Sequence, residues 1–186
     1  MTFTAFSAIA TNGQIHREGQ LSYACFPAPT VQSHAANLKT LGDGRLGCVW
    51  SGGTQEGVAD ISIYFSALEQ DPAGGWAREW SEPRQLSFDS TRSEQNPILF
   101  THGEELWLLY TAQNAGNQDT SEVRRRISLD HGRTWSEAET LFAATAHGGV
   151  LMHQPPIVVG ERILLPVFRC ATDPDEKWVG MPMIRH

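Results

Sequence analysis

Short apolar runs recur along this chain at nearly constant spacing, and this internal repeat constrains the fold more than any other feature of the sequence. Leu46–Trp50, Leu106–Tyr110 and Ile163–Val167 each follow a turn of glycine and charged residues, and their last residues are 60 and 57 positions apart. A second apolar run precedes each of them, at 37–41, 97–100 and 156–159. Two apolar runs joined by a tight turn predict a β-hairpin. The sequence therefore predicts an all-β fold whose repeating unit begins with a hairpin.

An outer pair of strands repeats within the same unit. Trp80–Leu86 matches Trp135–Leu141 at a spacing of 55 residues, and Ile61–Ser66 corresponds to Val123–Ser128. Each complete unit thus contains four strands, as a blade of a β-propeller does. The blade units start near residues 32, 92 and 152, and the third reaches 178–186, where its outer hairpin is expected.

The fold class predicted from these units is a partial β-propeller. Residues 1–186 are expected to form a single domain with about three blades. Because a closed ring needs about four blades or more, we expect this chain to be the N-terminal part of a longer propeller. The alternative is that an oligomer partner closes the ring.

Charge and composition exclude several classes of partner. The net charge of −7 argues against binding nucleic acid or an anionic membrane surface through bulk electrostatics. Residues 1–10 have no basic start and no apolar run, and no later stretch is long enough to span a membrane, so a cytoplasmic location is expected. Cys25, Cys48 and Cys170 lack CxxC spacing, which favours reduced thiols over a zinc site. No cofactor is predicted, although a structural or catalytic calcium stays open.

The segment Ser128–Trp135 has the pattern Ser-x-Asp-x-Gly-x-x-Trp, in which each defining position serves a tight turn. Asp130 can accept hydrogen bonds from backbone N–H groups further along the turn, and Gly132 permits a positive φ. Trp135 supplies a large apolar surface that can pack beneath the hairpin. The pattern resembles the Asp-box, a repeat found between the outer strands of sialidase-type propeller blades. In this comparison, residues 67–79 correspond to an expanded, degenerate box.

Polar residues gather where the first strand of each unit begins. These starts read Gln32–His34, Arg92–Asn96 and Met152–Gln154. In a propeller the first strands converge on the central channel, so these side chains are expected near its mouth. The loops Gly52–Asp60 and Gln113–Thr120 can return to the same end. Their amides and carboxylates suit sugar hydroxyls, which both donate and accept hydrogen bonds.

His34 is the candidate catalytic residue, because an imidazole can act as a general acid or base near neutral pH. It can equally be a structural histidine. The candidate substrate-binding residues are Glu56, Arg92, Gln95, Asn96, Gln118, Asp119, His153, Gln154 and Arg169. Arg92 and Arg169 are included because guanidinium groups can bind a carboxylate bidentately. The basic run Arg124–Arg126 is interpreted as a solvated blade edge.

Across residues 20–170 the sequence resembles the sialidase-like proteins of the neuraminidase-repeat superfamily. The resemblance lies in His34–Leu38, Trp50–Gly57, Arg92–Phe100 and Gly116–Thr120. It implies a six- or seven-bladed propeller and an exo-acting glycosidase with a carbohydrate substrate. The chain lacks the Phe/Tyr-Arg-Ile-Pro motif of true sialidases, and His34 lies near the place of its arginine.

Because the chain lacks the Phe/Tyr-Arg-Ile-Pro motif, two alternatives to hydrolysis stay open. Related propeller lyases that cleave at uronic acids use histidine for proton abstraction, which agrees with His34. A non-catalytic glycan-binding propeller would also suit polar loops without a complete set of catalytic groups.

Overall fold

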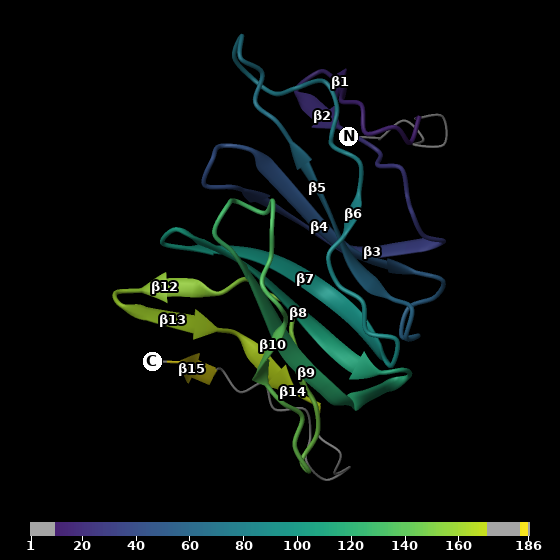
Figure 1. The fold of residues 1–186 in the computed structure, drawn as a ribbon, viewed down its shortest axis with the longest axis vertical. Helices are drawn as coiled ribbons and strands as arrows, with labels where there is room; N and C mark the ends of the chain where they lie inside the picture. The colour runs from purple at the N-terminus through teal and green to yellow at the C-terminus, as the bar shows by residue number, and fades with distance from the viewer. Residues whose placement is uncertain (1–9, 171–182, 186) are drawn as a thin grey trace.

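The computed structural model describes residues 10–170 and 183–185, and within these residues every regular element is a β-strand (Figure 1). Residues 1–9, judged above for a secretory signal, and most of the predicted outer hairpin of the third unit lie outside the described residues. No helix in the described part of the chain is long and apolar enough to cross a membrane. The cytoplasmic location stays a prediction.

Two complete four-stranded antiparallel sheets form the centre of the molecule. Blade 1 runs in the order β3 (Gln32–Thr40), β4 (Leu46–Gly53), β5 (Ser62–Leu68) and β6 (Arg84–Gln85). Blade 2 contains β7 (Arg92–His102), β8 (Glu105–Asn114), β9 (Asn117–Ser128) and β10 (Glu139–Phe142), paired in sequence order. Adjacent strands in each sheet are thus consecutive in the chain, which is the arrangement of a propeller blade.

A third unit follows blade 2, and a short hairpin precedes blade 1. In blade 3, β11 (Val150–Met152) pairs with β14 (Val167–Arg169), and β12 (Ile157–Val159) with β13 (Arg162–Leu165), which also pairs with β15 (Met183–Arg185). Pro155, Pro156 and Pro166 lie where these pairings break, because proline has no N–H to donate to a ladder. The N-terminal hairpin consists of β1 (His16–Glu18) and β2 (Leu21–Tyr23).

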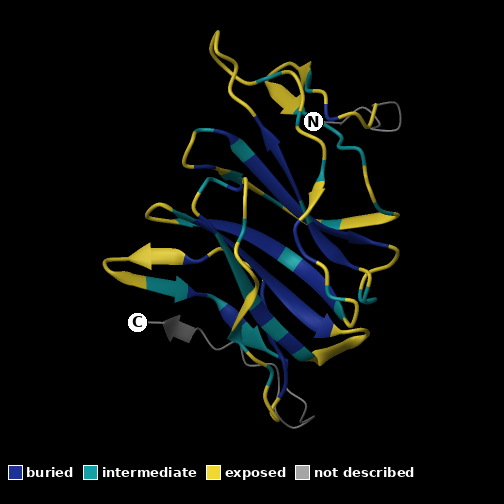
Figure 2. Ribbon diagram, viewed as in Figure 1, coloured by how far each residue is buried: buried dark blue, intermediate teal, exposed yellow. Residues whose placement is uncertain are grey.

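Strand β8 is buried on both faces, which explains its continuous apolar sequence. Side chains alternate along a strand, so Leu108 and Tyr110 face blade 1, whereas Trp107 and Leu109 face blade 3. Figure 2 shows the buried residues concentrated on β4, β5, β7 and β8. Complete burial of each leucine contributes about 1.5–3 kcal/mol. The core therefore lies between the blades, and the predicted all-β fold of propeller blades is confirmed.

The Asp-box forms the predicted turn between β9 and β10. Asp130 Oδ1 accepts hydrogen bonds from the backbone N–H groups of Arg133 and Thr134 at 3.0 and 2.8 Å. Ser128 Oγ accepts another from Gly132 N–H at 2.7 Å, and Gly132 has a φ of 89°. Trp135 packs edge-on against Phe65 of blade 1, with ring centroids 6.4 Å apart. The box therefore fixes the outer hairpin and also joins two blades.

The interpretation of Arg124–Arg126 as a solvated edge is wrong. Arg124 forms ion pairs with Asp89 at 3.0 Å and with Glu94 at 3.6 Å. Arg126 donates a hydrogen bond to the Leu86 carbonyl at 2.7 Å. Arg125 stacks over the Trp107 ring and pairs with Glu139. The run was misread because most of its partners lie far from it in the sequence.

Candidate functional site

The first strands of blades 1 and 2 carry the same irregularity at the positions of the candidate residues. In β3 the pairing shifts between His34 and Asn37, and in β7 it shifts between Gln95 and Ile98. The next residues, Ala35 and Asn96, have φ angles of 54° and 53°. Each site is a β-bulge, in which an extra residue bends the strand and redirects its side chains.

A buried hydroxyl supports each bulge in the same way. Ser51 Oγ donates to the His34 carbonyl at 3.2 Å, and Thr111 Oγ1 donates to the Gln95 carbonyl at 3.1 Å. Both hydroxyl residues lie on the neighbouring second strand and are at most 2% exposed. These bonds supply a buried hydrogen-bond donor to the carbonyl at each shift in register. The backbone at His34 and Gln95 is therefore fixed.

A polar cleft of about 590 Å³ lies between blades 1 and 2. The loop after β4 and the turn between β8 and β9 form it, and Gly116 N–H donates to the Gly57 carbonyl across it at 2.9 Å. Its polar lining consists of amide and carboxylate residues: Glu56, Gln95, Gln113, Asn117, Gln118 and Asp119. Four of the predicted substrate-binding residues, Glu56, Gln95, Gln118 and Asp119, are thus brought together.

Hydrogen bonds orient several side chains of the polar cleft before any ligand binds. Gln95 is 8% exposed and donates to Ser93 Oγ at 2.8 Å. Gln113 accepts from Ser121 Oγ at 3.1 Å. Buried amides held in this way can present their remaining donors and acceptors without first losing conformational freedom.

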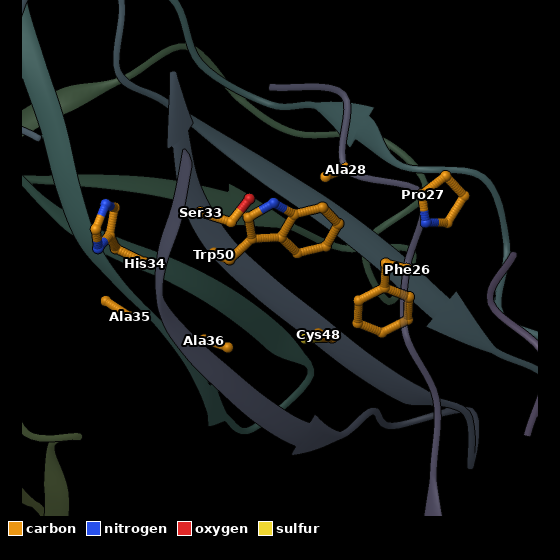
Figure 3. Close-up of a pocket in the computed structure, with 9 residues that line it drawn as sticks. All are labelled: Phe26, Pro27, Ala28, Ser33, His34, Ala35, Ala36, Cys48 and Trp50. Carbon is orange, nitrogen blue, oxygen red and sulfur yellow. The ribbon is translucent and has the colours of Figure 1, made fainter. Parts of the chain in front are cut away.

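His34 lies beside the polar cleft, in contact with its rim through Gln32. Gln32 Oε1 is 3.3 Å from His34 Nε2 and accepts from Glu56 N–H at 3.2 Å. His34 also belongs to the lining of a separate, smaller cleft of about 350 Å³ with Phe26, Cys48 and Trp50, although its imidazole points away from the Phe26 and Trp50 rings (Figure 3). Burial raises the pKa of the Cys48 thiol to about 12, which keeps it protonated and unsuited to nucleophilic attack. A catalytic role for His34 stays a prediction.

Asn96 and His153 form a second point of contact between blades, at the border of blade 3. Asn96 Nδ2 lies 3.3 Å from His153 Nε2 and 3.3 Å from Thr111 Oγ1. His153 also packs edge-on against Phe168. The neighbouring Gln154 is exposed. These residues do not line the polar cleft, although Asn96 follows Gln95 directly in the chain.

The two arginines predicted as carboxylate clamps lie outside the polar cleft. Arg92 donates to the carbonyls of Ala112 and Thr120 at 3.1 Å each, and its guanidinium is 3.8 Å from Glu122. It therefore ties together β7, β8 and β9. Arg169 lies in β14 opposite Val150. Whether either arginine contacts a substrate stays a prediction.

Sequence reasoning placed Gln32, Gln113 and Asn117 within the polar strand start and loop but did not choose them as candidate substrate-binding residues. Gln113 was detectable in principle, because it pairs with Ser93 across the ladder, two residues before Gln95. Gln32 precedes His34 by two residues and shares its side of the strand. Among the described residues, no group of three or more His, Cys, Asp or Glu side chains could hold a metal ion. That the protein uses no cofactor stays a prediction, and a calcium site stays open.

Comparison with known proteins gives a family match and several structural matches. The profile of the family described as BNR repeat-like domain matches residues 44–183. No curated protein matches the chain. A Hadza microbial sialidase superimposes with a TM-score of 0.62 at 14% identity, covering 83% of this chain and 34% of that protein.

Two glycoside hydrolases are also similar in structure. A thermostable family-43 enzyme has a TM-score of 0.55 at 15% identity, over 82% of this chain and 53% of that one. A family 117 enzyme from the marine bacterium Zobellia galactanivorans also has a TM-score of 0.55, at 14% identity, over 74% of this chain and 48% of the enzyme. The chain thus spans about a third to a half of the length of these structures, and at such identities the likeness concerns the fold.

Proposed function

Because the chain belongs to the BNR repeat-like domain family, whose profile matches residues 44–183, we propose that it contributes the substrate-binding cleft and a pair of reacting carboxyl groups to an exo-acting glycoside hydrolase. The observation that carries this proposal is the polar cleft between blades 1 and 2. Its amides and carboxylates offer both donors and acceptors, which a sugar with several hydroxyl groups requires. The substrate is therefore a carbohydrate.

Two carboxylates line this one cleft and come from different blades, Glu56 from blade 1 and Asp119 from blade 2. Glycoside hydrolysis commonly uses a pair of carboxyl groups, one of which protonates the leaving oxygen. A sugar seated between the blades would meet both groups. This pair supports hydrolysis, and His34 is assigned to the rim, where it acts on the substrate or orients Gln32.

The uronate-lyase alternative has less support among the described residues. Its mechanism requires a cation that neutralises the substrate carboxylate, so that the adjacent proton becomes acidic. Arg92 donates instead to two backbone carbonyls. The polar cleft has no arginine or lysine in its lining. We therefore prefer the hydrolase.

The test is turnover of a panel of fluorogenic glycosides, including a sialoside, an arabinofuranoside and a galactoside. Release of the fluorophore is expected for at least one glycoside, and Glu56→Gln and Asp119→Asn should each lower kcat/KM by roughly a hundredfold or more. Glu104→Gln is the matched control, because Glu104 is exposed in the β7–β8 turn and lies outside the cleft lining. His34→Ala is expected to lower turnover as well.

Two results would contradict the proposal. Ultraviolet absorbance from an unsaturated uronate product would identify a lyase. Saturable binding on a glycan array without turnover of any glycoside would identify a non-catalytic glycan-binding propeller.

A further inference from the structure

A second cleft, also of about 590 Å³, lies at the N-terminal hairpin. We call it the arginine cleft; its side-chain lining includes Gln14, Ile15, Arg17, Asp71, Trp76 and Arg78. These residues come from the segment leading into β1, from β1 itself, which contains Arg17, and from the connection between β5 and β6. In Figure 1 the hairpin β1–β2 lies at the upper end of the molecule, away from β8 and β9. The arginine cleft shares no lining residue with the polar cleft.

Backbone hydrogen bonds hold the two walls of the arginine cleft together. Gln14 and Glu79 form an antiparallel bridge, with Ile15 N–H donating to the Arg78 carbonyl at 2.8 Å. In this register Ile15 lies opposite Arg78. Two residues further along each wall come Arg17 and Trp76, on the same side, because side chains alternate with a period of two. The arginines and the indole therefore share one face.

The wall that carries Trp76 is an addition to the blade. In blade 2, Ser136 N–H donates to the Ile127 carbonyl at 2.8 Å and closes the outer hairpin. In blade 1, Ser81 N–H donates to the Ala67 carbonyl at 2.8 Å and closes the hairpin in the same way. The chain from Ala67 to Ser81 in blade 1 is longer than the chain from Ile127 to Ser136 in blade 2, although the same backbone hydrogen bond closes both hairpins. Its extra residues are thus not needed to complete the blade.

The added segment is nevertheless ordered by its own turn. Asp71 N–H donates to the Gly75 carbonyl at 3.0 Å, and Gly74 N–H donates to the Asp71 carbonyl at 2.8 Å. Gly74 and Gly75 have φ angles of 99° and 89°, which residues with a β-carbon rarely adopt. The turn leaves Trp76 38% exposed. An indole held partly in solvent by a dedicated turn offers a flat apolar surface to a ligand.

Arg17 and Arg78 are both exposed, and neither forms an ion pair with any described residue. Arg45, Arg124 and Arg125 elsewhere in the chain are all paired with carboxylates. A guanidinium without a partner can bind a carboxylate or sulfate bidentately. Two such groups beside an indole fit a ligand that carries anionic groups and a flat apolar face.

We propose that the arginine cleft is a binding site for an anionic saccharide bearing carboxylate or sulfate groups. Trp76 packs against the apolar face of one sugar ring, and Arg17 and Arg78 bind its acidic groups. Gln14 and Asp71 Oδ2 can accept hydrogen bonds from hydroxyls, whereas Asp71 Oδ1 already accepts one from Ala73 N–H at 2.9 Å. Nucleic acid fits this cleft less well, because its closely spaced phosphates would bring further anionic groups beside the Asp71 carboxylate. The site does not depend on the proposed hydrolase activity.

The test is calorimetric titration of the protein with an oligogalacturonate, a sulfated oligosaccharide and a neutral oligosaccharide of equal length. We expect saturable binding of at least one acidic saccharide, weakened by salt, and much weaker binding of the neutral one. The double variant Arg17→Gln/Arg78→Gln should lose roughly tenfold or more in affinity, equivalent to about 1.4 kcal/mol. Trp76→Ala should also weaken binding.

Arg162→Gln is the matched control, because Arg162 is exposed, unpaired among the described residues and far from this cleft in the sequence. It should leave the affinity unchanged, and all variants should keep the parent's thermal midpoint. An unchanged affinity in the double arginine variant would overturn the proposal. Equal binding of the neutral saccharide would overturn it too, as would tighter binding of a polyglutamate peptide.

Discussion

At the scale of single residues, the side chain with the best-defined role is Asp130, which accepts hydrogen bonds from backbone N–H groups of its turn. Asp130 accepts hydrogen bonds from Arg133, Thr134 and Ser128. The bonds from the Thr134 side chain and backbone contribute most to holding the Asp130 pKa well below its ordinary value. Because the folded state favours the ionised carboxylate, this group stabilises the fold only at pH values where it is charged.

Asp130→Asn should therefore lower the thermal midpoint at pH 7, because an amide has only one acceptor oxygen for these donors. The folded-state pKa is lowered, so the stability that Asp130 adds is complete above its unfolded value of about 3.9 and declines as the pH falls below it. The difference between parent and variant should shrink in that range. Thermal unfolding from pH 7 to pH 3 measures it, with Glu137→Gln as an exposed control. A difference that stays constant with pH would contradict this account.

The two β-bulges show which backbone conformations can be predicted from single residues and which cannot. Asn96 tolerates a positive φ better than most residues, so its conformation had a detectable signal. Ala35 adopts the same conformation without any such signal. Only comparison of the two blades in space shows that His34 and Gln95 are equivalent positions.

At the scale of strands, β7 begins with a buried charge that joins two blades. Glu94 is 1% exposed, its N–H donates to the Ile61 carbonyl at 3.0 Å, and its carboxylate lies 3.6 Å from Arg124. Burial raises the pKa of Glu94, and this effect outweighs the hydrogen bond from Ser87 and the attraction of Arg124. Arg124 also forms ion pairs with Asp89 and Glu122, so its positive charge does not compensate Glu94 alone.

The free energy of unfolding of the Glu94→Gln variant should increase relative to that of the parent as the pH rises. A carboxyl whose pKa is raised on folding contributes stability below its unfolded value of about 4.3, and that contribution is lost as the pH rises through the folded value. The glutamine variant has no such loss. Urea unfolding of both proteins between pH 4 and pH 8 tests this, and a relative stability of the variant that falls with pH would contradict the raised pKa.

The sequence predicted the strands better than the contacts between them. The repeat of Trp80–Leu86 with Trp135–Leu141 correctly indicated two equivalent outer hairpins, because local turn chemistry and alternation determine them. The roles of Arg124 and Arg92 could not be predicted from the sequence, since their partners lie up to 35 residues away or on the backbone of other strands. The polar cleft was predicted in part, because loops at equivalent ends of two blades must lie near each other.

At the scale of the whole molecule, the blades are held together by two cores on opposite faces of β8. One core contains Leu108 and Phe65 and joins blades 1 and 2. The other contains Leu109 and Met152 and joins blades 2 and 3. The outer faces are less covered, since Leu38 of β3 is 59% exposed. Blade 2 is therefore the unit through which the other two are coupled.

Leu108 and Leu109 provide a matched pair for testing this coupling, because both are fully buried neighbours in one strand. Leu108→Ala and Leu109→Ala should each lower the free energy of unfolding by about 2–5 kcal/mol. Their local effects should differ. Amide hydrogen exchange should increase in β4 and β5 for Leu108→Ala, and in β11 and β14 for Leu109→Ala, since each substitution removes contacts on one face only. Increased exchange in the same strands for both variants would show that the blades open as a single unit.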